Sequence, residues 1–459
     1  MLTKNQTLTA MVEGLGANGE GVLHHEGQAL FVPYALPGEE VKVRIEKATR
    51  SHAFGKVLGV LRKSESRVEP PCPYFYRCGG CVCQHMAYET QRQFKQDQVQ
   101  NCLLRIGGLT VPVSPVIGME NPWRYRNKTA MPVQDFEQGP KAGYYAPRSH
   151  RLIPIDFCLI ADPASDLAKD AVLQWMQRCG VPAYNEERGT GLVRHIVTRT
   201  NRAFESLVTL AVNGDDIPDK EQLIALLKAV LPAPFSLSLS IQKSGGNVIL
   251  GSQETILYGP GTLTETLGGL TFELGSSTFF QVNREVCEKM YRHAIFAARE
   301  GGGGTLLDLY CGVGTISLMA AKYFDRVIGI DVSQASIASA NINAARNDVK
   351  NALFYEDEAE KLLPDLLKGG LLVDSVILDP PRKGAHPDVL SAVVKANPGR
   401  IVYISCHPPS QARDAAILEG IGYEAVSSQP FDMFCQTGQV ENVLVLQNKT
   451  GEKQDEQSA

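Results

Sequence analysis

Long apolar runs are absent from this chain of 459 residues. No stretch approaches the roughly 18 consecutive apolar residues of a membrane-spanning helix. The first six residues also lack the charged-then-apolar layout of a secretion signal. These absences argue against a membrane partner, and we expect a cytoplasmic protein. The composition is 44% hydrophobic and 21% charged, which allows large buried cores, and the length predicts about three domains.

The cysteine content also argues against a disulfide framework. It has eleven cysteines, an odd number, in a long chain. Secreted disulfide scaffolds are usually short and carry an even number of cysteines. Some of the eleven cysteines are therefore candidates for metal binding or catalysis. We expect most of them to be ordinary buried residues.

An overall positive charge is missing too, since the formal net charge is −5. This balance argues weakly against a polyanionic partner, but the charge is unevenly distributed. Residues 42–67 hold eight Lys or Arg against two Glu, and residues 92–151 hold nine basic residues against four acidic ones. The N-terminal third can therefore present a positive face to phosphates.

Short runs of alternating apolar and polar residues fill the first 62 positions. They predict five strands, at residues 9–13, 21–24, 29–33, 40–46 and 56–61. Five such strands predict a small β-barrel of the oligonucleotide-binding type over residues 1–66. Gly14, residues 19–22 and residues 54–57 resemble the TRAM domain found on RNA-modifying enzymes, and that resemblance implies RNA binding.

Three cysteines follow at spacings of six and three, namely Cys72, Cys78 and Cys81. Two glycines separate the last pair, so backbone amides can approach ligand sulfurs. Cys158 is the best candidate for a fourth ligand, although Cys83 offers a neighbouring thiol in the same turn. The spacing alone suits tetrahedral zinc and a four-iron cluster equally.

The rest of residues 67–265 predicts a mixed α+β central domain. An amphipathic pattern over residues 86–106 predicts a helix that packs between domains, on the catalytic one. Arginines alternate with aromatic residues in 123–128, and more follow in 143–151. Such segments can hold phosphates and stack splayed bases, so we expect an RNA-binding surface here.

Strands and helices alternate from about residue 300 onward. An apolar strand enters a turn with Gly312 and Gly314, and Asp331 ends the next strand, 23 residues after Asp308. This arrangement is typical of the first turn of a nucleotide-binding doubly wound sheet, with Asp331 placed to bind ribose hydroxyls. The chain lacks the full dinucleotide fingerprint, which favours S-adenosylmethionine over a nicotinamide.

Two later strands end at chemically active residues. Asp379-Pro380-Pro381 follows one, and Cys406 follows the next. Ligands bind at the carboxyl ends of such strands, so Asp331, Asp379 and Cys406 should meet in one crevice. Addition of a thiolate to C6 of uracil makes C5 nucleophilic. The C5 proton must then leave, and Glu441, at the start of the last strand, is the candidate base.

Together these segments resemble the RNA uracil-5-methyltransferases, which make 5-methyluridine in ribosomal or transfer RNA. The resemblance rests on Cys72, Cys78, Cys81 and Cys158, on residues 279–283 and 308–315, on Asp379-Pro380-Pro381-Arg382, on Ser405-Cys406, on residues 412–414 and on Glu441. It implies an α/β methyltransferase domain at 266–449 and a four-iron cluster on the four cysteines rather than zinc. It also implies that Gln281, Tyr310, Asp331 and Asp379 contact S-adenosylmethionine, that Cys406 is the nucleophile and that Glu441 accepts the proton. The polar composition of residues 450–459 separately predicts a disordered tail.

The TRAM-like segment and the cysteine set look like the ribosomal RNA branch, so 23S ribosomal RNA is the favoured substrate and transfer RNA the alternative. No obligate protein partner is evident, and we expect a monomer. The departures are His407, where the family usually has Asn, Gln439, where it has His, and Asp331, where it more often has Glu. There are two rival classes. A non-catalytic RNA-binding protein would have no use for Cys406 and Glu441 together. A DNA cytosine-5 methyltransferase uses the same thiolate chemistry, but it places its nucleophile after the fourth strand, whereas Cys406 follows the fifth.

Overall fold

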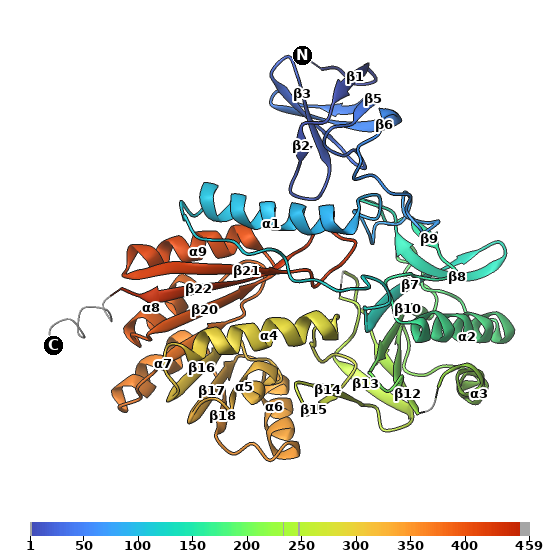
Figure 1. Cartoon of the computed structure of the whole chain (residues 1–459). Helices are drawn as coiled ribbons and strands as arrows, with labels where there is room; N and C mark the ends of the chain where they lie inside the picture. The colour runs from blue at the N-terminus through green and yellow to red at the C-terminus, as the bar shows by residue number, and fades with distance from the viewer. Residues whose placement is uncertain (1, 233, 247, 450–459) are drawn as a thin grey trace.

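The computed structural model describes residues 2–232, 234–246 and 248–449, so the tail expected to be disordered, 450–459, lies outside the described residues. Its strands form three large sheets and one hairpin. In Figure 1 the N-terminal sheet is a separate lobe above helix α1 (Tyr88–Arg105), and the other two sheets lie side by side below. No helix in these ranges is long and apolar enough to cross a membrane.

The N-terminal sheet has six strands: β1 (Thr7–Met11), β2 (Gly14–Leu15), β3 (Gly21–His25), β4 (Gln28–Val32), β5 (Glu40–Ala48) and β6 (His52–Arg62). All five predicted strands appear, and the two-residue β2 was not predicted. The order β1-β5-β6-β4-β3-β2 is open in the described part of the chain, whereas we expected the pairing to close into a barrel. Alternation along β5 buries Val41 and Val43 and exposes Lys42 and Arg44, so its outer face is basic.

A buried ion pair ties this sheet to the segment that follows it. The Glu39 carboxylate is fully buried, and Arg67 donates to it from Nε at 2.5 Å and from Nη2 at 2.8 Å. The same carboxylate accepts from the backbone N–H of Leu36 at 2.9 Å. Burial raises the pKa of Glu39, but these hydrogen bonds outweigh it, and the net pKa is lowered.

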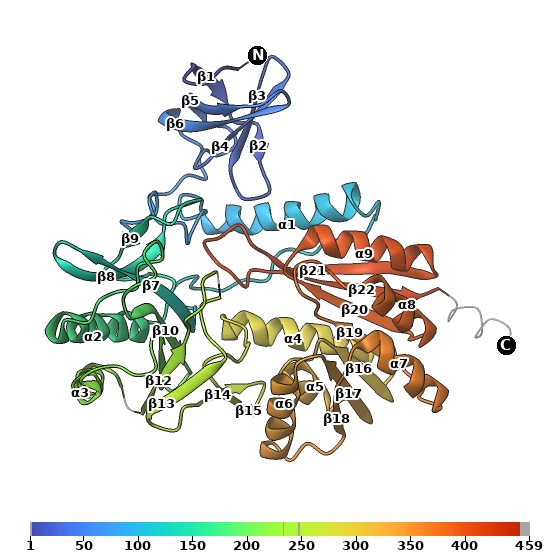
Figure 2. The ribbon, with the colours of Figure 1, turned by 180° about the vertical axis from the view of Figure 1, so that it is seen from behind.

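The central sheet has the order β13-β12-β11-β10-β7-β8-β9. Its strands are β7 (Lys128–Phe136), β8 (Gly139–Tyr145), β9 (Leu152–Pro154), β10 (Val193–Thr200), β11 (Ser206–Val212), β12 (Phe235–Ile241) and β13 (Gln253–Tyr258). Helices α2 (Pro163–Cys179) and α3 (Lys220–Val230) pack against it, as seen from behind in Figure 2. Trp175 of α2 is fully buried in this core. The sheet thus supplies a mixed α+β layer next to the C-terminal domain.

The hairpin β14 (Leu263–Leu267) and β15 (Leu270–Leu274) leads into the C-terminal sheet, whose order is β18-β17-β16-β19-β20-β22-β21. The parallel strands are β16 (Thr305–Leu309), β17 (Arg326–Asp331), β18 (Ala352–Glu356), β19 (Ser375–Leu378) and β20 (Arg400–Ser405), while β22 (Glu441–Asn448) runs antiparallel between β20 and β21 (Tyr423–Phe431). The expected doubly wound sheet is confirmed.

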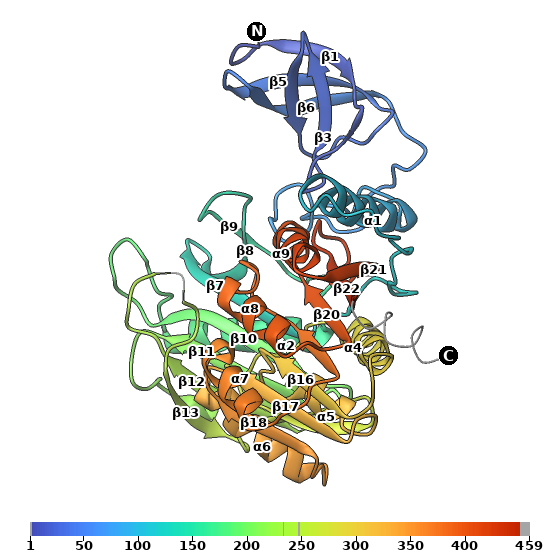
Figure 3. The same ribbon diagram turned by 90° about the vertical axis from the view of Figure 1, so that its left-hand side faces the viewer.

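Helices cover both faces of this sheet, as its apolar central strands require. They are α4 (Arg284–Arg299), α5 (Thr315–Ala320), α6 (Gln334–Arg346), α7 (Ala359–Lys368), α8 (Pro387–Lys395) and α9 (Pro408–Gly420). Two separate hydrophobic clusters result, one on each face. Helix α1 packs on α9 and β21, between the N-terminal lobe and this domain (Figure 3).

An extended segment before the central sheet lies along the outer strand of the C-terminal sheet. Val113 and Ile117 form parallel bridges with Ser428 and Phe431 of β21. Ser114 donates its N–H to the Ser428 carbonyl at 2.9 Å. Residues 113–117 therefore cover an edge that would otherwise expose unpaired backbone groups.

We expect Arg67→Met to destabilise the N-terminal sheet by about 3 kcal/mol, because it leaves the Glu39 carboxylate buried without its partner. Amide exchange of β5 and β6 would measure the loss, with the exposed Arg62→Met as the control. Equal protection in both variants would contradict the assigned role of Arg67.

The same ion pair predicts a pH dependence. Since the folded-state pKa of Glu39 is lowered, the stabilisation should be present above pH 4.5 and lost as the pH falls below it.

Candidate active site

A cavity of about 870 Å³ opens at the carboxyl ends of the parallel strands. It is lined, among others, by Gln281, Tyr310, Gly312, Asp331, Asp379, Cys406 and Glu441, which are seven of the eight catalytic and cofactor-binding residues expected from the sequence. Parallel pairing of β16 with β17 and β19, and of β19 with β20, brings these strand ends to one edge. This is the position at which doubly wound sheets bind ligands.

The eighth residue, Gly314, does not line the cavity in the described structure. It is the N-cap of α5 with φ of 79°, and a Cβ there would lie 2.8 Å from the Phe354 ring. Gly312 has φ of 55°, and a Cβ there would meet nothing within 4 Å. Both positions favour glycine through their backbone angle, but only Gly312 faces open space within the cavity.

The Asp331 carboxylate is fixed by the backbone around it. Its two oxygens accept the N–H groups of Gly312 at 3.0 Å and Ser333 at 2.8 Å. A carboxylate has further lone pairs, so it can still accept from ligand hydroxyls. The geometry suits the ribose-binding role expected for this residue.

Two other carboxyl groups, Asp379 in the lining of the cavity and the buried Asp308, have strongly raised pKa values. Burial raises the pKa of Asp308 to about 7, against the effect of Ser317, whose hydroxyl donates to it at 2.5 Å. Burial, and then the nearby Asp308 charge, raises the pKa of Asp379 to about 7. A carboxyl group that stays protonated near neutral pH can donate a hydrogen bond, which an ordinary aspartate cannot.

Cys406 and Glu441 lie at adjacent ends of two neighbouring strands. The antiparallel register of β20 and β22 ends at the pair Ser405 and Asn442, so Cys406 follows directly after β20 and Glu441 is the first residue of β22. Both side chains line the cavity, and Glu441 is only 3% exposed. The sheet itself thus holds a thiol beside a carboxyl group.

The pKa values of Cys406 and Glu441 are both raised. Burial raises the pKa of Cys406 to about 11, with further increases from Glu441 and Asp379 and a decrease from Arg382. Burial, and then Asp379, raises the pKa of Glu441 well above its usual value. A carboxylate with raised proton affinity is a competent general base next to a nucleophile. Arg382, which also lines the cavity, was not singled out from the sequence, although its motif was.

His407, which stands where the family usually has Asn, has a structural role. It is the N-cap of α9, where Nδ1 accepts the Ser410 N–H at 3.3 Å and lies 3.0 Å from the Ser410 hydroxyl. Asn is a common N-cap residue, so either side chain can fix the turn after Cys406. Gln439 is exposed, and its N–H donates to the Thr437 hydroxyl at 3.3 Å.

The four cysteines are close enough to affect one another. Burial raises the pKa of Cys78 and Cys81, and the charges of Cys158 and Cys72 add to both. Cys83 has no such coupling to this set and packs with Leu36 and Met86. In the described ranges, however, no three His, Cys, Asp or Glu side chains are arranged to hold a single metal ion.

Part of the expected RNA surface turns inward instead, which corrects the prediction. Arg124 donates to Asp166 at 3.1 Å and to the Cys158 carbonyl at 2.8 Å, and the buried Tyr125 donates to the Cys435 carbonyl at 3.0 Å. These side chains hold the fold together. Arg148 and Arg151 remain exposed.

Comparisons with known proteins give a consistent result. Residues 262–449 match the sequence profile described as tRNA (Uracil-5-)-methyltransferase, and residues 2–58 match that of the TRAM domain. An uncharacterized RNA methyltransferase of Halalkalibacterium halodurans is 39% identical over 98% of each chain. One from Caldanaerobacter subterraneus is 40% identical over 95% of this chain and 97% of its own.

A solved structure shares nearly the whole architecture. It is the Pyrococcus abyssi tRNA (uracil-54, C5)-methyltransferase in complex with S-adenosyl-L-homocysteine. The two chains are 25% identical with a TM-score of 0.76, over 96% of this chain and all of the other. The N-terminal lobe, the central sheet and the C-terminal sheet are thus shared with an enzyme of known structure.

We expect iodoacetamide to alkylate Cys406 slowly at pH 8 and faster toward pH 11, because its raised pKa keeps the thiol protonated. Glu441→Gln should accelerate alkylation at pH 8, since it removes a carboxyl group that raises this pKa. Peptide mass spectrometry reports the rate. Cys102, whose pKa is raised by burial alone, is the internal control and should not change. Equal Cys406 rates in both proteins would rule out the coupling.

Proposed function

Because this chain belongs to the RNA uracil-5-methyltransferases, which use S-adenosylmethionine, we propose that it converts a uridine of 23S ribosomal RNA to 5-methyluridine. The observation that carries the proposal is that Cys406, directly after β20, and Glu441, at the start of the neighbouring β22, line one cavity. Uracil C5 alone is too poor a nucleophile to take a methyl group from a sulfonium. A thiol and a base on either side of the ring remove that difficulty.

The methyl donor would be held by Gln281, Tyr310, Gly312, Asp331 and Asp379. The cavity fits it, because Gly312 leaves open space and the Asp331 carboxylate is fixed by two amides. When bound, S-adenosylmethionine supplies the methyl group. Gly314 would serve by packing against Phe354 rather than by contact with this ligand.

Cys406 begins the reaction by adding to C6 of the uracil. The thiol loses its proton, the Sγ–C6 bond forms, and the electrons of the C5–C6 double bond move toward C5 and the carbonyl oxygen at C4. The Cys406 pKa of about 11 disfavours the thiolate, and Arg382 is the nearby cation that opposes this.

Glu441 completes the reaction after C5 has gained its methyl group. C5 then carries both the methyl group and its original proton. The Glu441 carboxylate accepts that proton, the C5–C6 double bond forms again, and the Sγ–C6 bond breaks to release the Cys406 thiolate. Its raised pKa gives Glu441 the proton affinity that this step needs.

RNA would reach the cavity along the basic parts of the N-terminal half. Lys42 and Arg44 of β5 and Lys56 of β6 are exposed on one sheet, and Arg44 pairs directly with Lys56 in the register. Clustered cations bind the phosphate backbone without reading its sequence. The choice of uridine must therefore depend on RNA shape and on the cavity.

Transfer RNA is a second candidate substrate. The Pyrococcus abyssi enzyme, named for uracil 54 of transfer RNA, aligns over nearly the whole chain, N-terminal lobe included. Because an enzyme named for transfer RNA has the same domain layout, the layout does not by itself favour ribosomal RNA. The preference for 23S ribosomal RNA rests on the resemblance to the branch with this cysteine set.

The resemblance to this family assigns Cys72, Cys78, Cys81 and Cys158 to a four-iron cluster rather than to zinc. The thiols lie near enough to one another to influence each other's pKa. Gly80, whose N–H lies 3.4 Å from the Cys78 sulfur, leaves its amide near the ligand.

The test is methyl transfer from labelled S-adenosylmethionine to unmodified ribosomal and transfer RNA, followed by nucleoside analysis. We expect 5-methyluridine in 23S ribosomal RNA. Cys406→Ala should abolish this methylation and keep S-adenosylmethionine binding, whereas Glu441→Gln should trap a covalent protein–RNA adduct.

Other outcomes would change the proposal. Label in transfer RNA alone would change the substrate and keep the mechanism. An active Cys406→Ala enzyme would refute the mechanism, and no label from folded protein would favour a binding role.

We expect Cys78→Ser to lower iron content and weaken RNA binding by about tenfold or more, because the cluster holds the structure around it. The rate of methyl transfer from bound RNA should change far less. Iron and zinc analysis, RNA titration and single-turnover kinetics measure these effects, with Cys102→Ser as the control. A fully folded Cys78→Ser protein in which only the chemical step is slow would contradict the structural role.

A further inference from the structure

Residues 432–440 connect β21 to β22 along one side of the cavity. The segment has no helix or strand of its own, yet Phe434 lines the cavity and Glu441 follows at its end. An irregular segment keeps one conformation only if its surroundings fix it. The position of the proposed base therefore depends on what holds these residues.

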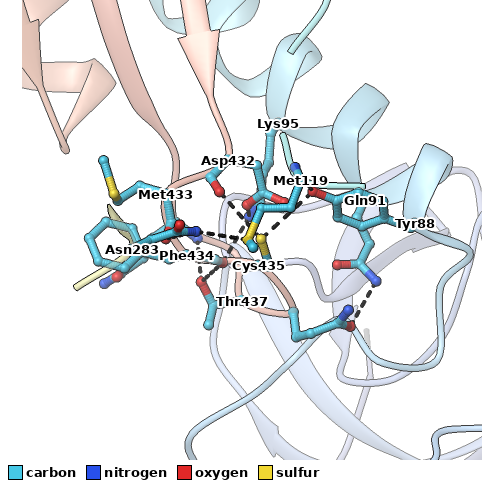
Figure 4. A network of polar contacts seen from close by, with 12 residues as sticks. Tyr88, Gln91, Lys95, Met119, Asn283, Asp432, Met433, Phe434, Cys435 and Thr437 are labelled. Carbon is cyan, nitrogen blue, oxygen red and sulfur yellow. Dashed lines mark hydrogen bonds and ion pairs between the residues drawn. The ribbon is translucent and has the colours of Figure 1, made fainter. Parts of the chain in front are cut away.

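A buried ion pair holds the start of the segment. Lys95 of α1 lies 2.5 Å from the Asp432 carboxylate, and both side chains are fully buried. Lys95 Nζ also donates to the Phe434 carbonyl at 3.0 Å. Figure 4 shows Lys95 reaching from the helix to Asp432 and the backbone beyond it.

Other groups from distant parts of the chain meet the same segment. Gln91 of α1 donates to the Gln436 side chain at 3.0 Å, and Asn283 donates to the Met433 carbonyl at 3.3 Å (Figure 4). The N–H groups of Val82 and Cys83 both donate to the Gln436 carbonyl, at 3.0 and 3.1 Å. The cysteine-rich turn and α1 thus hold the segment from the side away from the cavity.

Stability alone does not explain a fully buried Lys–Asp pair. The cost of removing both charges from water is commonly as large as their attraction, and apolar residues of similar size are often as stable. A charged pair does differ in one respect, because its directional hydrogen bonds restrict the geometry more than apolar contacts do. Lys95 bonds both to the Asp432 side chain and to the Phe434 backbone, so it fixes the segment at two points.

We propose that Lys95 and Asp432 are positioning residues for the methylation reaction, which hold residues 432–440 so that Phe434 and Glu441 face the bound uracil. The inference rests on the function proposed above. Neither residue touches the cavity, and they act through the segment between them and Glu441. Loss of the pair should therefore impair proton removal from C5 more than binding of S-adenosylmethionine, whose expected ligands lie outside residues 432–440.

The test uses the full-length double variant Lys95→Met/Asp432→Asn, which keeps side-chain size and leaves no unpaired charge. Lys95→Met alone leaves the Asp432 carboxylate buried without its partner, and it shows how far loss of the pair affects folding. Gln93→Ala, on the exposed face of the same helix, is the matched control. Each protein is mixed with labelled S-adenosylmethionine and the RNA that the wild type methylates, and free product and covalent adduct are followed over time.

We expect the double variant to bind S-adenosylmethionine as the wild type does, to turn over at least about tenfold more slowly, and to accumulate methylated covalent adduct. A purely structural role would lower the folded, active fraction without accumulation of adduct, and that result would overturn the inference, as would wild-type turnover.

The wild type and Glu441→Gln separate this inference from the proposed function. If Glu441→Gln traps adduct and the double variant does not, only the positioning role fails. A wild type that methylates no uridine overturns both.

Discussion

The structure depends above all on the pairing of β20 with β22. Cys406 follows the last residue of one strand and Glu441 begins the other, so the pairing brings both residues to the same edge of the sheet. A shift of the register by one residue would turn Glu441 to the opposite face of the sheet. The pairing therefore places the proposed nucleophile and the proposed base in one cavity. What remains variable is the segment that joins β21 to β22, and the rest of the molecule holds that segment.

Burial decides the acidity of the site. Cys406, Asp379 and Glu441 all have raised pKa values, and in each case removal from water is the largest cause. Three acidic groups in one cavity would repel one another if all were ionised. The protein tolerates the arrangement because raised pKa values let protons remain on some of them. Proton affinity is thus a property of the group as a whole, with Arg382 as the opposing charge.

Sequence reasoning reached most of the catalytic sheet, because apolar strands that end in glycine or acidic residues leave a local pattern. It also predicted that Cys406 and Glu441 would reach one crevice, and both line the cavity. It could not find Lys95 and Asp432, which lie 337 positions apart, because a lysine in an amphipathic helix resembles any surface cation. For the same reason Arg124 was expected to meet RNA but instead binds Asp166, since orientation is set by tertiary contacts.

The edge of the catalytic sheet has a consequence for how this protein can be divided. Residues 113–117 complete the edge of β21, and α1 supplies the countercharge to Asp432. Both come from before the central sheet, far outside the stretch that matches the methyltransferase profile. Residues 262–449 alone would form a sheet with β21 uncovered and Asp432 buried without its countercharge. The catalytic domain is therefore completed by two separate stretches of the chain, and the central sheet lies between them in the sequence.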